Sequence, residues 1–273
     1  MSKTYAVIGD PIDHSLSPNI HNAAFKELGL DCTYIAYRIP KGELAEGLES
    51  LKKIQIAGFN VTIPHKIEIM KYLDKVDEDC SLIGASNTVT NNNGTLKGYN
   101  TDMDGFLEPI KRKKIAVEGT NVLLLGAGGA ARAIIAGFAK ERASSITIVN
   151  RTKEKAMSIA QFAKKIGVKT NVVSLDKIGD SISEYKFIVN ATSIGLKNEQ
   201  TPLPTETISQ DSVVYDIVYM PMNTDLIKKS KEKGATIIYG YEMLLGQAAK
   251  AFEIWHGTKA PYEAMKRALL GGF

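Results

Sequence analysis

The chain has 273 residues, of which 44% are hydrophobic and 23% are charged, values typical of a soluble globular protein with one large or two small domains. The net charge of +4 is spread along the chain, and the basic run at 111–114 contains no aromatic residue, so no nucleic-acid partner is expected. Two cysteines do not make a disulfide scaffold, and the four histidines lack metal-ligand spacing, so no metal is expected.

The N-terminal residues enter a strand-like run directly and contain no long apolar stretch. A signal peptide or a membrane span requires such a stretch. We therefore expect a cytoplasmic protein with no membrane partner.

Short β-branched runs alternate with helical patterns in the first hundred residues. Ser17 followed by Pro18 indicates a helix start with Ser17 as the N-cap. Asn93 and Gly94, between two short runs, predict a hairpin turn. The expected strands cover 5–8, 33–37 and 59–63, the expected helices cover 17–28, 43–52 and 65–73, and the expected hairpin pairs 88–90 with 95–98.

The second half begins near Gly105 and repeats the order strand, helix, strand. The wholly apolar run at 122–125 is typical of a central parallel strand that is buried on both faces. The pattern predicts an α/β fold, with a doubly wound Rossmann-type domain after an N-terminal α/β domain. The expected strands cover 122–125, 146–149, 172–173, 187–190, 213–216 and 237–238. One expected helix follows the glycine-rich turn and ends near 140, a second covers 153–166, and helical structure is expected over most of 241–273.

A glycine-rich turn follows the apolar run. Residues 126–131 read Gly-Ala-Gly-Gly-Ala-Ala, a G-x-G-x-x-A pattern between a strand and a helix. Gly126 permits the tight turn, Gly128 lets the backbone approach a pyrophosphate, and Ala131 allows close packing of helix on strand. The pattern predicts a dinucleotide site at the helix N-terminus, where amide groups attract phosphates. A tight turn without a ligand is the alternative.

The next strand is followed by Asn150, Arg151 and Thr152, with Lys155 close by. NAD sites usually place an acidic residue here to accept a hydrogen bond from the ribose 2′-hydroxyl. This chain has none, whereas an arginine can pair with a 2′-phosphate and stack on adenine. The sequence therefore predicts NADP rather than NAD, and an ordinary surface arginine is the alternative.

Two serines, Ser15 and Ser17, lie beside the first expected helix. The role of N-cap accounts for Ser17, but it does not account for Ser15. Two hydroxyls beside a helix N-terminus could hold a carboxylate, because the amide dipoles favour an anion there.

Lys66 lies in an unusual position, since Pro64 is expected to begin a helix with Lys66 in its first turn. A helix N-terminus disfavours the charged form of a lysine, which suits an acid–base group. A lysine that extends into water is the alternative.

Two carboxylates precede the helix expected at Phe106. Either Asp102 or Asp104 could be its N-cap, but both cannot fill that role. A spare carboxylate near Lys66 would offset the lysine's position and orient it. That would give a Lys–Asp pair suited to proton transfer at a carbonyl or a hydroxyl.

The segment 241–257 is expected to be an amphipathic helix. Glu242, Lys250 and Glu253 fall on its polar outer face, and Leu244 falls on its apolar stripe. Gln247 falls on the boundary, where its amide can reach a cleft.

Taken together, these motifs resemble those of the shikimate dehydrogenase family along essentially the whole chain. The set, in this order, is far more specific than any single motif. The matching segments are 15–18 (Ser-Leu-Ser-Pro), 60–66 (Asn-Val-Thr-Ile-Pro-His-Lys), 86–88 (Ser-Asn-Thr), 100–102 (Asn-Thr-Asp), 126–130, 150–152, 216–221 (Asp-Ile-Val-Tyr-Met-Pro) and 240–244 (Gly-Tyr-Glu-Met-Leu), with Gln247.

The resemblance implies reversible reduction of 3-dehydroshikimate to shikimate with NADPH, a step of the shikimate pathway to chorismate and the aromatic amino acids. It implies that Lys66 is the acid–base group and that Asp102 is its partner. The substrate site that it implies comprises Ser15, Ser17, Thr62, Lys66, Asn87, Asp102, Tyr219 and Gln247. The NADP site that it implies comprises Gly126, Ala127, Gly128, Gly129, Ala130, Asn150, Arg151, Thr152, Lys155, Ile217, Gly240 and Met243.

The resemblance also implies a domain organisation. A substrate-binding and catalytic domain is expected at 1–104 and an NADP-binding Rossmann domain at 105–240. The C-terminal helices at 241–273 would pack back on the first domain. The protein is expected to be a monomer or a homodimer.

Two other functions remain open. A quinate or quinate/shikimate dehydrogenase that uses NAD or NADP would share most of these motifs. A non-catalytic ligand sensor could have the same fold, although the presence of both Lys66 and Asp102 argues against it.

Overall fold

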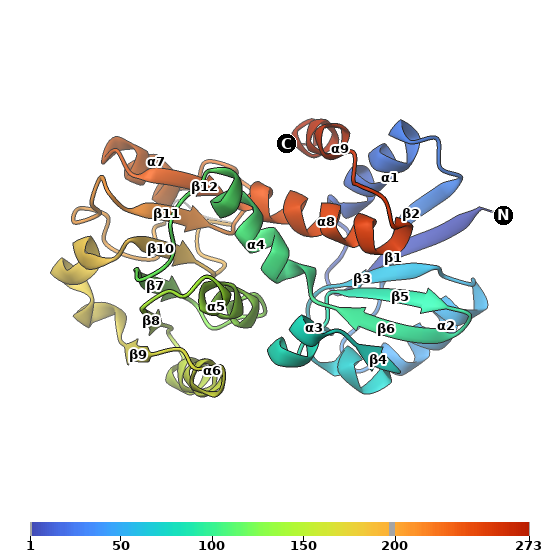
Figure 1. The fold of residues 1–273 in the computed structure, drawn as a ribbon, viewed down its shortest axis with the longest axis horizontal. Helices are drawn as coiled ribbons and strands as arrows, with labels where there is room; N and C mark the ends of the chain where they lie inside the picture. The colour runs from blue at the N-terminus through green and yellow to red at the C-terminus, as the bar shows by residue number, and fades with distance from the viewer. Residues whose placement is uncertain (1, 197–199, 273) are drawn as a thin grey trace. The chain divides into compact units, whose positions relative to one another are not determined.

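The computed structural model describes residues 2–196 and 200–272, which form two compact units. The first unit comprises the chain up to Gly105 together with Leu245–Gly272, and the second comprises Phe106–Leu244. Helices α4 (Thr101–Arg112) and α8 (Gly240–His256) carry the chain from one unit to the other (Figure 1). No helix among the described residues is long and apolar enough to cross a membrane.

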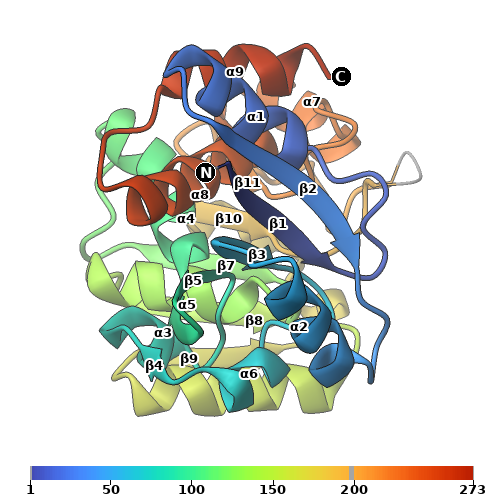
Figure 2. The ribbon, with the colours of Figure 1, turned by 90° about the vertical axis from the view of Figure 1, so that its right-hand side faces the viewer.

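The first unit is built on a mixed sheet with the strand order β2-β1-β3-β5-β6-β4. Its first three strands are parallel, and β5 and β6 form the antiparallel hairpin expected around Asn93 and Gly94. Helix α9 packs against α1 (Figures 1 and 2), so the C-terminal segment returns to this unit. The elements are β1 (Lys3–Gly9), α1 (Ser17–Glu27), β2 (Cys32–Arg38), α2 (Leu44–Lys53), β3 (Gly58–Val61), η1 (Glu68–Tyr72), β4 (Lys75–Val76), α3 (Glu78–Ile83), β5 (Thr88–Asn92), β6 (Thr95–Tyr99) and α9 (Tyr262–Leu270). Phe273, the last residue of the expected helical segment, lies outside the described residues.

Both faces of strand β1 are buried, which explains why its sequence is continuously apolar. Ala6 and Ile8 pack on the side of α2, in one cluster with Leu48. Tyr5 faces the other side and contacts the ring of Trp255 from α8 at a centroid distance of 4.9 Å. Helix α8 therefore fills the core of the first unit, although Trp255 lies 250 residues after Tyr5 in the sequence (255 − 5).

A fully buried histidine, His21, lies among these rings and stacks on Tyr34 at 4.4 Å. Burial in apolar surroundings, with a smaller contribution from His256, lowers the pKa of His21 to about 3. In the unfolded chain His21 has the ordinary histidine pKa of 6.5, so between pH 6.5 and about pH 3 the unfolded chain binds a proton at His21 that the folded chain does not bind. The stability that His21 contributes is therefore complete above the unfolded pKa and is lost as the pH falls toward 3.

We expect His21→Phe, which keeps a ring against Tyr34, to make folding less sensitive to acid. Between pH 7 and pH 5 the wild-type chain should lose about 2 kcal/mol more unfolding free energy than the variant, at about 1.4 kcal/mol per pH unit below 6.5. Urea titrations at the two pH values measure this difference. The exposed residue His14 provides the control, since His14→Asn should follow the wild-type curve; parallel curves for His21→Phe would contradict the account.

The second unit is built on a parallel sheet with the strand order β12-β11-β10-β7-β8-β9. This is the doubly wound order, with its reversal beside β7, and it confirms the predicted fold class. The strands expected from the sequence all lie in this sheet. The elements are β7 (Asn121–Leu125), α5 (Ala131–Lys140), β8 (Ser145–Val149), α6 (Lys153–Lys165), β9 (Thr170–Val173), η2 (Leu175–Lys177), η3 (Gly179–Glu184), β10 (Phe187–Asn190), β11 (Val213–Asp216), α7 (Asp225–Glu232) and β12 (Thr236–Tyr239).

Three predictions about helix starts are wrong. Ser17 is the first residue of α1 and not its N-cap; the Ser15 hydroxyl accepts from the Ser17 N–H at 3.3 Å instead. Lys66 lies in a turn before the short 3-10 helix η1, so it is not in the first turn of a helix as expected. Only His65 and Ile69 of this segment are buried, which is too little to stabilise an α-helix.

The third wrong prediction concerns Asp102 and Asp104. Helix α4 begins at Thr101, so both carboxylates lie in its first turn and neither is the N-cap. The cap comes from a distant residue, because the Asn87 side-chain oxygen accepts from the Thr101 N–H at 2.7 Å. Local sequence reasoning could not locate this contact.

The polar face expected on α8 is also wrong at Glu242, which is buried. Its carboxylate accepts from the Tyr239 N–H at 3.1 Å and from Arg112 at 2.5 Å. The first contact caps the start of α8, and the second neutralises the buried charge with a residue from the basic run at 111–114.

Candidate active site

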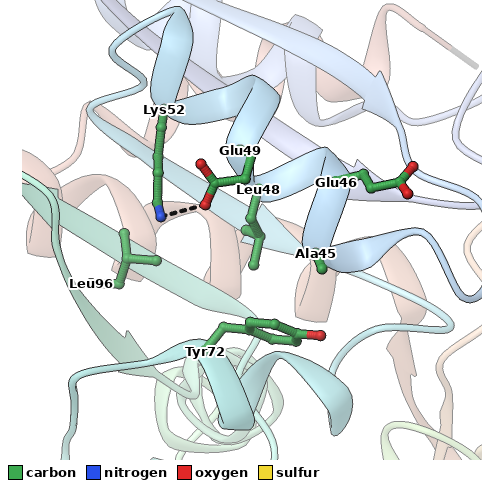
Figure 3. Close-up of a pocket in the computed structure, with 7 residues that line it drawn as sticks. All are labelled: Ala45, Glu46, Leu48, Glu49, Lys52, Tyr72 and Leu96. Atoms are coloured by element: carbon green, nitrogen blue, oxygen red, sulfur yellow. Dashed lines mark hydrogen bonds and ion pairs between the residues drawn. The ribbon is translucent and has the colours of Figure 1, made fainter.

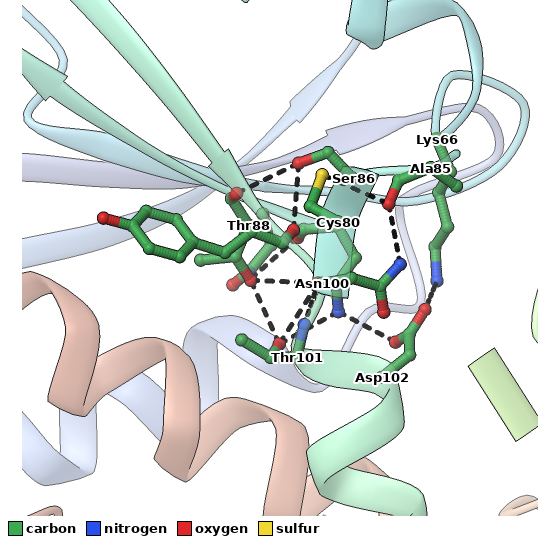
Figure 4. Close-up of polar contacts among 11 residues, drawn as sticks. Lys66, Cys80, Ala85, Ser86, Thr88, Asn100, Thr101 and Asp102 are labelled. Carbon is green, nitrogen blue, oxygen red and sulfur yellow. Dashed lines mark hydrogen bonds and ion pairs between the residues drawn. The ribbon is translucent and has the colours of Figure 1, made fainter. Parts of the chain in front are cut away.

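The structure brings Lys66 and Asp102 together in the first unit (Figure 4). The Lys66 Nζ donates to Asp102 Oδ2 at 2.5 Å, and the two side chains are 17% and 8% exposed. Lys66 follows β3 in a turn, and Asp102 lies in the first turn of α4, where the helix dipole favours a carboxylate. The predicted Lys–Asp pair therefore exists, although the reason given for it from the sequence was wrong.

Asn87 fixes the other oxygen of the aspartate. Its Nδ2 donates to Asp102 Oδ1 at 2.8 Å and to the Thr101 hydroxyl at 3.0 Å. With both oxygens engaged, the carboxylate has one orientation, and Lys66 is held beside it. Such a pair can hold and release a proton at a fixed place, which general acid–base catalysis requires.

Two residues behind this group were missed by the sequence reasoning. The Tyr34 hydroxyl donates to Asn60 Oδ1 at 2.6 Å, and Asn60 Nδ2 donates to the Asn87 carbonyl at 3.0 Å. Burial raises the pKa of Tyr34 well above its ordinary value, so it stays a donor. The available signal was Asn60 itself, a polar residue in a strand expected to be buried, where its amide needs partners.

The two predicted serines lie at the start of α1. Ser17 is buried, whereas Ser15 is partly exposed. Thr62 follows β3 and lies so close to Gly9 that a Cβ there would be 2.4 Å from its methyl group. Gln247, on α8, is buried in the same unit.

The predicted nucleotide residues belong to the second unit. Gly126 has φ +107°, and a Cβ there would lie 2.7 Å from the Ala191 carbonyl oxygen, so the turn after β7 requires glycine. Gly128 and Gly129 are exposed at the turn. Asn150 holds the turn, because its Oδ1 accepts from the Ala127 N–H at 3.1 Å and its Nδ2 donates to the Thr152 carbonyl at 2.8 Å.

Arg151 and Lys155 are both exposed near the start of α6. Tyr219, Ile217 and Gly240 follow the ends of neighbouring strands in this unit. A Cβ on Gly240 would lie 2.5 Å from the Ile217 carbonyl oxygen, so the two segments are in close contact. Met243 is buried in the first turns of α8.

A pocket of about 260 Å³ lies elsewhere in the first unit, beside α2 (Figure 3). Its polar contact is the exposed ion pair between Lys52 and Glu49, and none of the predicted site residues line it. Within residues 2–196 and 200–272, no group of three or more metal-ligating side chains gathers.

A doubly wound nucleotide-binding unit, together with a unit that holds a lysine–aspartate pair, defines a dinucleotide-dependent oxidoreductase. Family models match residues 7–89 (Shikimate dehydrogenase substrate binding domain), 109–216 (Shikimate / quinate 5-dehydrogenase) and 240–270 (Shikimate 5'-dehydrogenase C-terminal domain). A curated relative from Nitrosopumilus maritimus, Shikimate dehydrogenase (NADP(+)), is 72% identical over the full length of both chains. The chain therefore belongs to the shikimate dehydrogenase family.

Solved structures of this family are similar to the chain over nearly its whole length. A Thermus thermophilus shikimate 5-dehydrogenase in complex with NADP(H) and shikimate is 34% identical, with a TM-score of 0.89 and coverage of 99% of this chain and 100% of that one. A Corynebacterium glutamicum quinate dehydrogenase in complex with NAD is 26% identical, with a TM-score of 0.93 and coverage of 99% of both chains.

Proposed function

We propose that this chain catalyses the reversible reduction of 3-dehydroshikimate to shikimate with NADPH, a step on the pathway to chorismate and the aromatic amino acids. The observation that carries the proposal is the Lys66–Asp102 pair, held in one orientation by Asn87. Because the chain belongs to the shikimate dehydrogenase family, we infer that 3-dehydroshikimate is the substrate on which this pair acts.

The residues of the second unit fit NADP. Gly128 and Gly129 expose backbone at the turn where the phosphates of a dinucleotide bind. Arg151 and Lys155 place exposed positive charge where an NAD site has an acidic residue, which suits a 2′-phosphate. Ile217, Gly240 and Met243 complete the proposed cofactor site. When bound, NADPH supplies the hydride.

Lys66 transfers the proton in this reaction. As the ring carbonyl carbon accepts the hydride, its oxygen takes a proton from the protonated amine of Lys66 and becomes a hydroxyl. In the reverse direction the neutral amine accepts the hydroxyl proton. Asp102 orients the amine throughout.

The remaining substrate residues bind and orient. Ser15 and Ser17 hold the carboxylate at the start of α1, where the amide dipoles favour an anion. Asn87 and Asp102 are proposed to take part in binding the ring hydroxyls. Thr62, Tyr219 and Gln247 line the rest of the proposed site.

The alternative function is that of a quinate or quinate/shikimate dehydrogenase, and a quinate dehydrogenase with bound NAD has a similar structure. Arg151 favours the shikimate and NADP reading. A cytoplasmic location, and a monomer or homodimer, complete the proposal.

Oxidation of shikimate and of quinate by NADP⁺ and by NAD⁺, followed side by side at the nicotinamide absorbance band, tests the proposal. We expect kcat/KM to be highest for shikimate with NADP⁺. Faster turnover of quinate would favour the alternative dehydrogenase, and no turnover of either acid would favour a sensor.

A further inference from the structure

A buried carboxylate in the second unit has no role in the function described so far. Asp216, the last residue of β11, is fully buried. Three neutral groups donate to it: the Thr224 hydroxyl at 2.6 Å, the Asn190 side chain at 2.9 Å and the Val218 N–H at 3.0 Å. Burial raises its pKa, so the hydrogen bonds must offset a substantial desolvation cost.

Asn190 extends the network into the preceding loop. It ends β10 and pairs in register with Asp216 on the neighbouring parallel strand. Its Oδ1 accepts from the Thr192 N–H at 3.0 Å and from the Thr192 hydroxyl at 2.7 Å, and its Nδ2 also donates to the Ile194 carbonyl at 3.2 Å. The loop after β10 is therefore tied to Asp216 through one side chain.

The two loops lie at the edge of the sheet where doubly wound folds bind nucleotides. The Ala191 carbonyl packs against Gly126 of the glycine-rich turn, and the Ile217 carbonyl packs against Gly240. Segments 191–194 and 217–219 therefore lie beside residues of the proposed cofactor site.

The chemistry of the carboxylate sets the orientation of its neighbours. Asp216 Oδ1 accepts from the Asn190 amide, which therefore turns its NH₂ toward Asp216 and its oxygen toward the two Thr192 donors. The Val218 N–H must point the same way, which fixes the peptide between Ile217 and Val218. Fully satisfied buried networks of this kind rigidify the segments that they join.

We propose that Asp216 is a positioning residue that holds loops 191–194 and 217–219 as one preformed edge for the nicotinamide half of the cofactor. The inference rests on the proposed function, because it assumes that NADPH binds to this unit. The adenosine half would bind at the glycine-rich turn and Arg151, which the network touches only through Ala191. Loss of the network should therefore affect the two halves unequally.

The test uses Asp216→Asn in the full-length chain, with binding measured by fluorescence titration. We expect the Kd for NADPH to rise about tenfold, the effect of losing one hydrogen bond to a charged group. The Kd for adenosine 2′,5′-bisphosphate, measured by its competition with NADPH, should stay within about twofold of wild type. Asp211→Asn, at an exposed aspartate before the same strand, is the matched control and should change neither constant.

Thr224 gives a second pair of variants in case Asp216→Asn does not fold. Thr224→Val keeps the side-chain shape but removes the hydroxyl, and it should raise the Kd for NADPH but not the Kd for adenosine 2′,5′-bisphosphate. Thr224→Ser keeps the hydroxyl and should bind NADPH as the wild type does. Equal weakening of both ligands would assign Asp216 a merely structural role and overturn the inference, as would unchanged affinity for NADPH. If the wild-type chain binds neither ligand, the proposed function fails instead.

Discussion

Lys66→Ala is expected to lower kcat by about two to four orders of magnitude, the usual range for a general acid–base group. Of the two side chains that donate to Asp102, Lys66 and Asn87, only the lysine amine can release a proton, because the Asn87 amide does not ionise. KM for the substrate should change much less, because Ser15 and Ser17 are proposed to anchor the carboxylate. Initial rates at saturating NADPH separate the two constants. Lys71→Ala, at an exposed lysine in η1, is the control and should keep kcat.

Asp102→Asn extends the same test. It should also lower kcat, because the new amide has no negative charge and only one oxygen, so it cannot accept from Lys66 and Asn87 through two separate oxygens as the carboxylate does. The double variant should lose less than the product of the two single losses, as expected of residues that act as a unit. A Lys66→Ala enzyme with near-wild-type kcat and only a raised KM would show that the lysine merely binds.

Arg151→Ala is expected to raise KM for NADP about 10- to 100-fold, because a charged hydrogen bond contributes roughly 1.5–3 kcal/mol. KM for NAD should change little, since NAD has no 2′-phosphate for the arginine to contact. Kinetics with both cofactors measure the difference.

Arg142→Ala provides the matched control for Arg151, because Arg142 is an exposed arginine that follows α5 in the same unit. It should leave both KM values unchanged. Equal effects of Arg151→Ala on NADP and NAD would remove the basis for assigning this residue to the 2′-phosphate.

Features specified by short stretches of sequence could be predicted. The sheet of the second unit follows from apolar runs such as 122–125, and its turn follows from Gly126, whose positive φ needs glycine. The helix signal at Pro64 failed, because only two side chains of that segment are buried and tertiary burial decides whether so short a helix forms.

Features set by distant contacts could not be predicted. Thr101 receives its cap from Asn87, and Asn60 receives its hydrogen bond from Tyr34. Neither pair is close in sequence, so no local pattern identifies the partners. The sequence could predict that Lys66 and Asp102 form a pair, but only the structure shows that Asn87 orients Asp102.

The most direct test of the central claim is the reaction of the purified chain with 3-dehydroshikimate and NADPH, followed at the nicotinamide absorbance band with analysis of the product. The account predicts that NADPH is consumed, that one shikimate forms for each NADPH oxidised, and that Lys66→Ala nearly abolishes the rate. Bound NADPH that is not oxidised in the presence of 3-dehydroshikimate would contradict it.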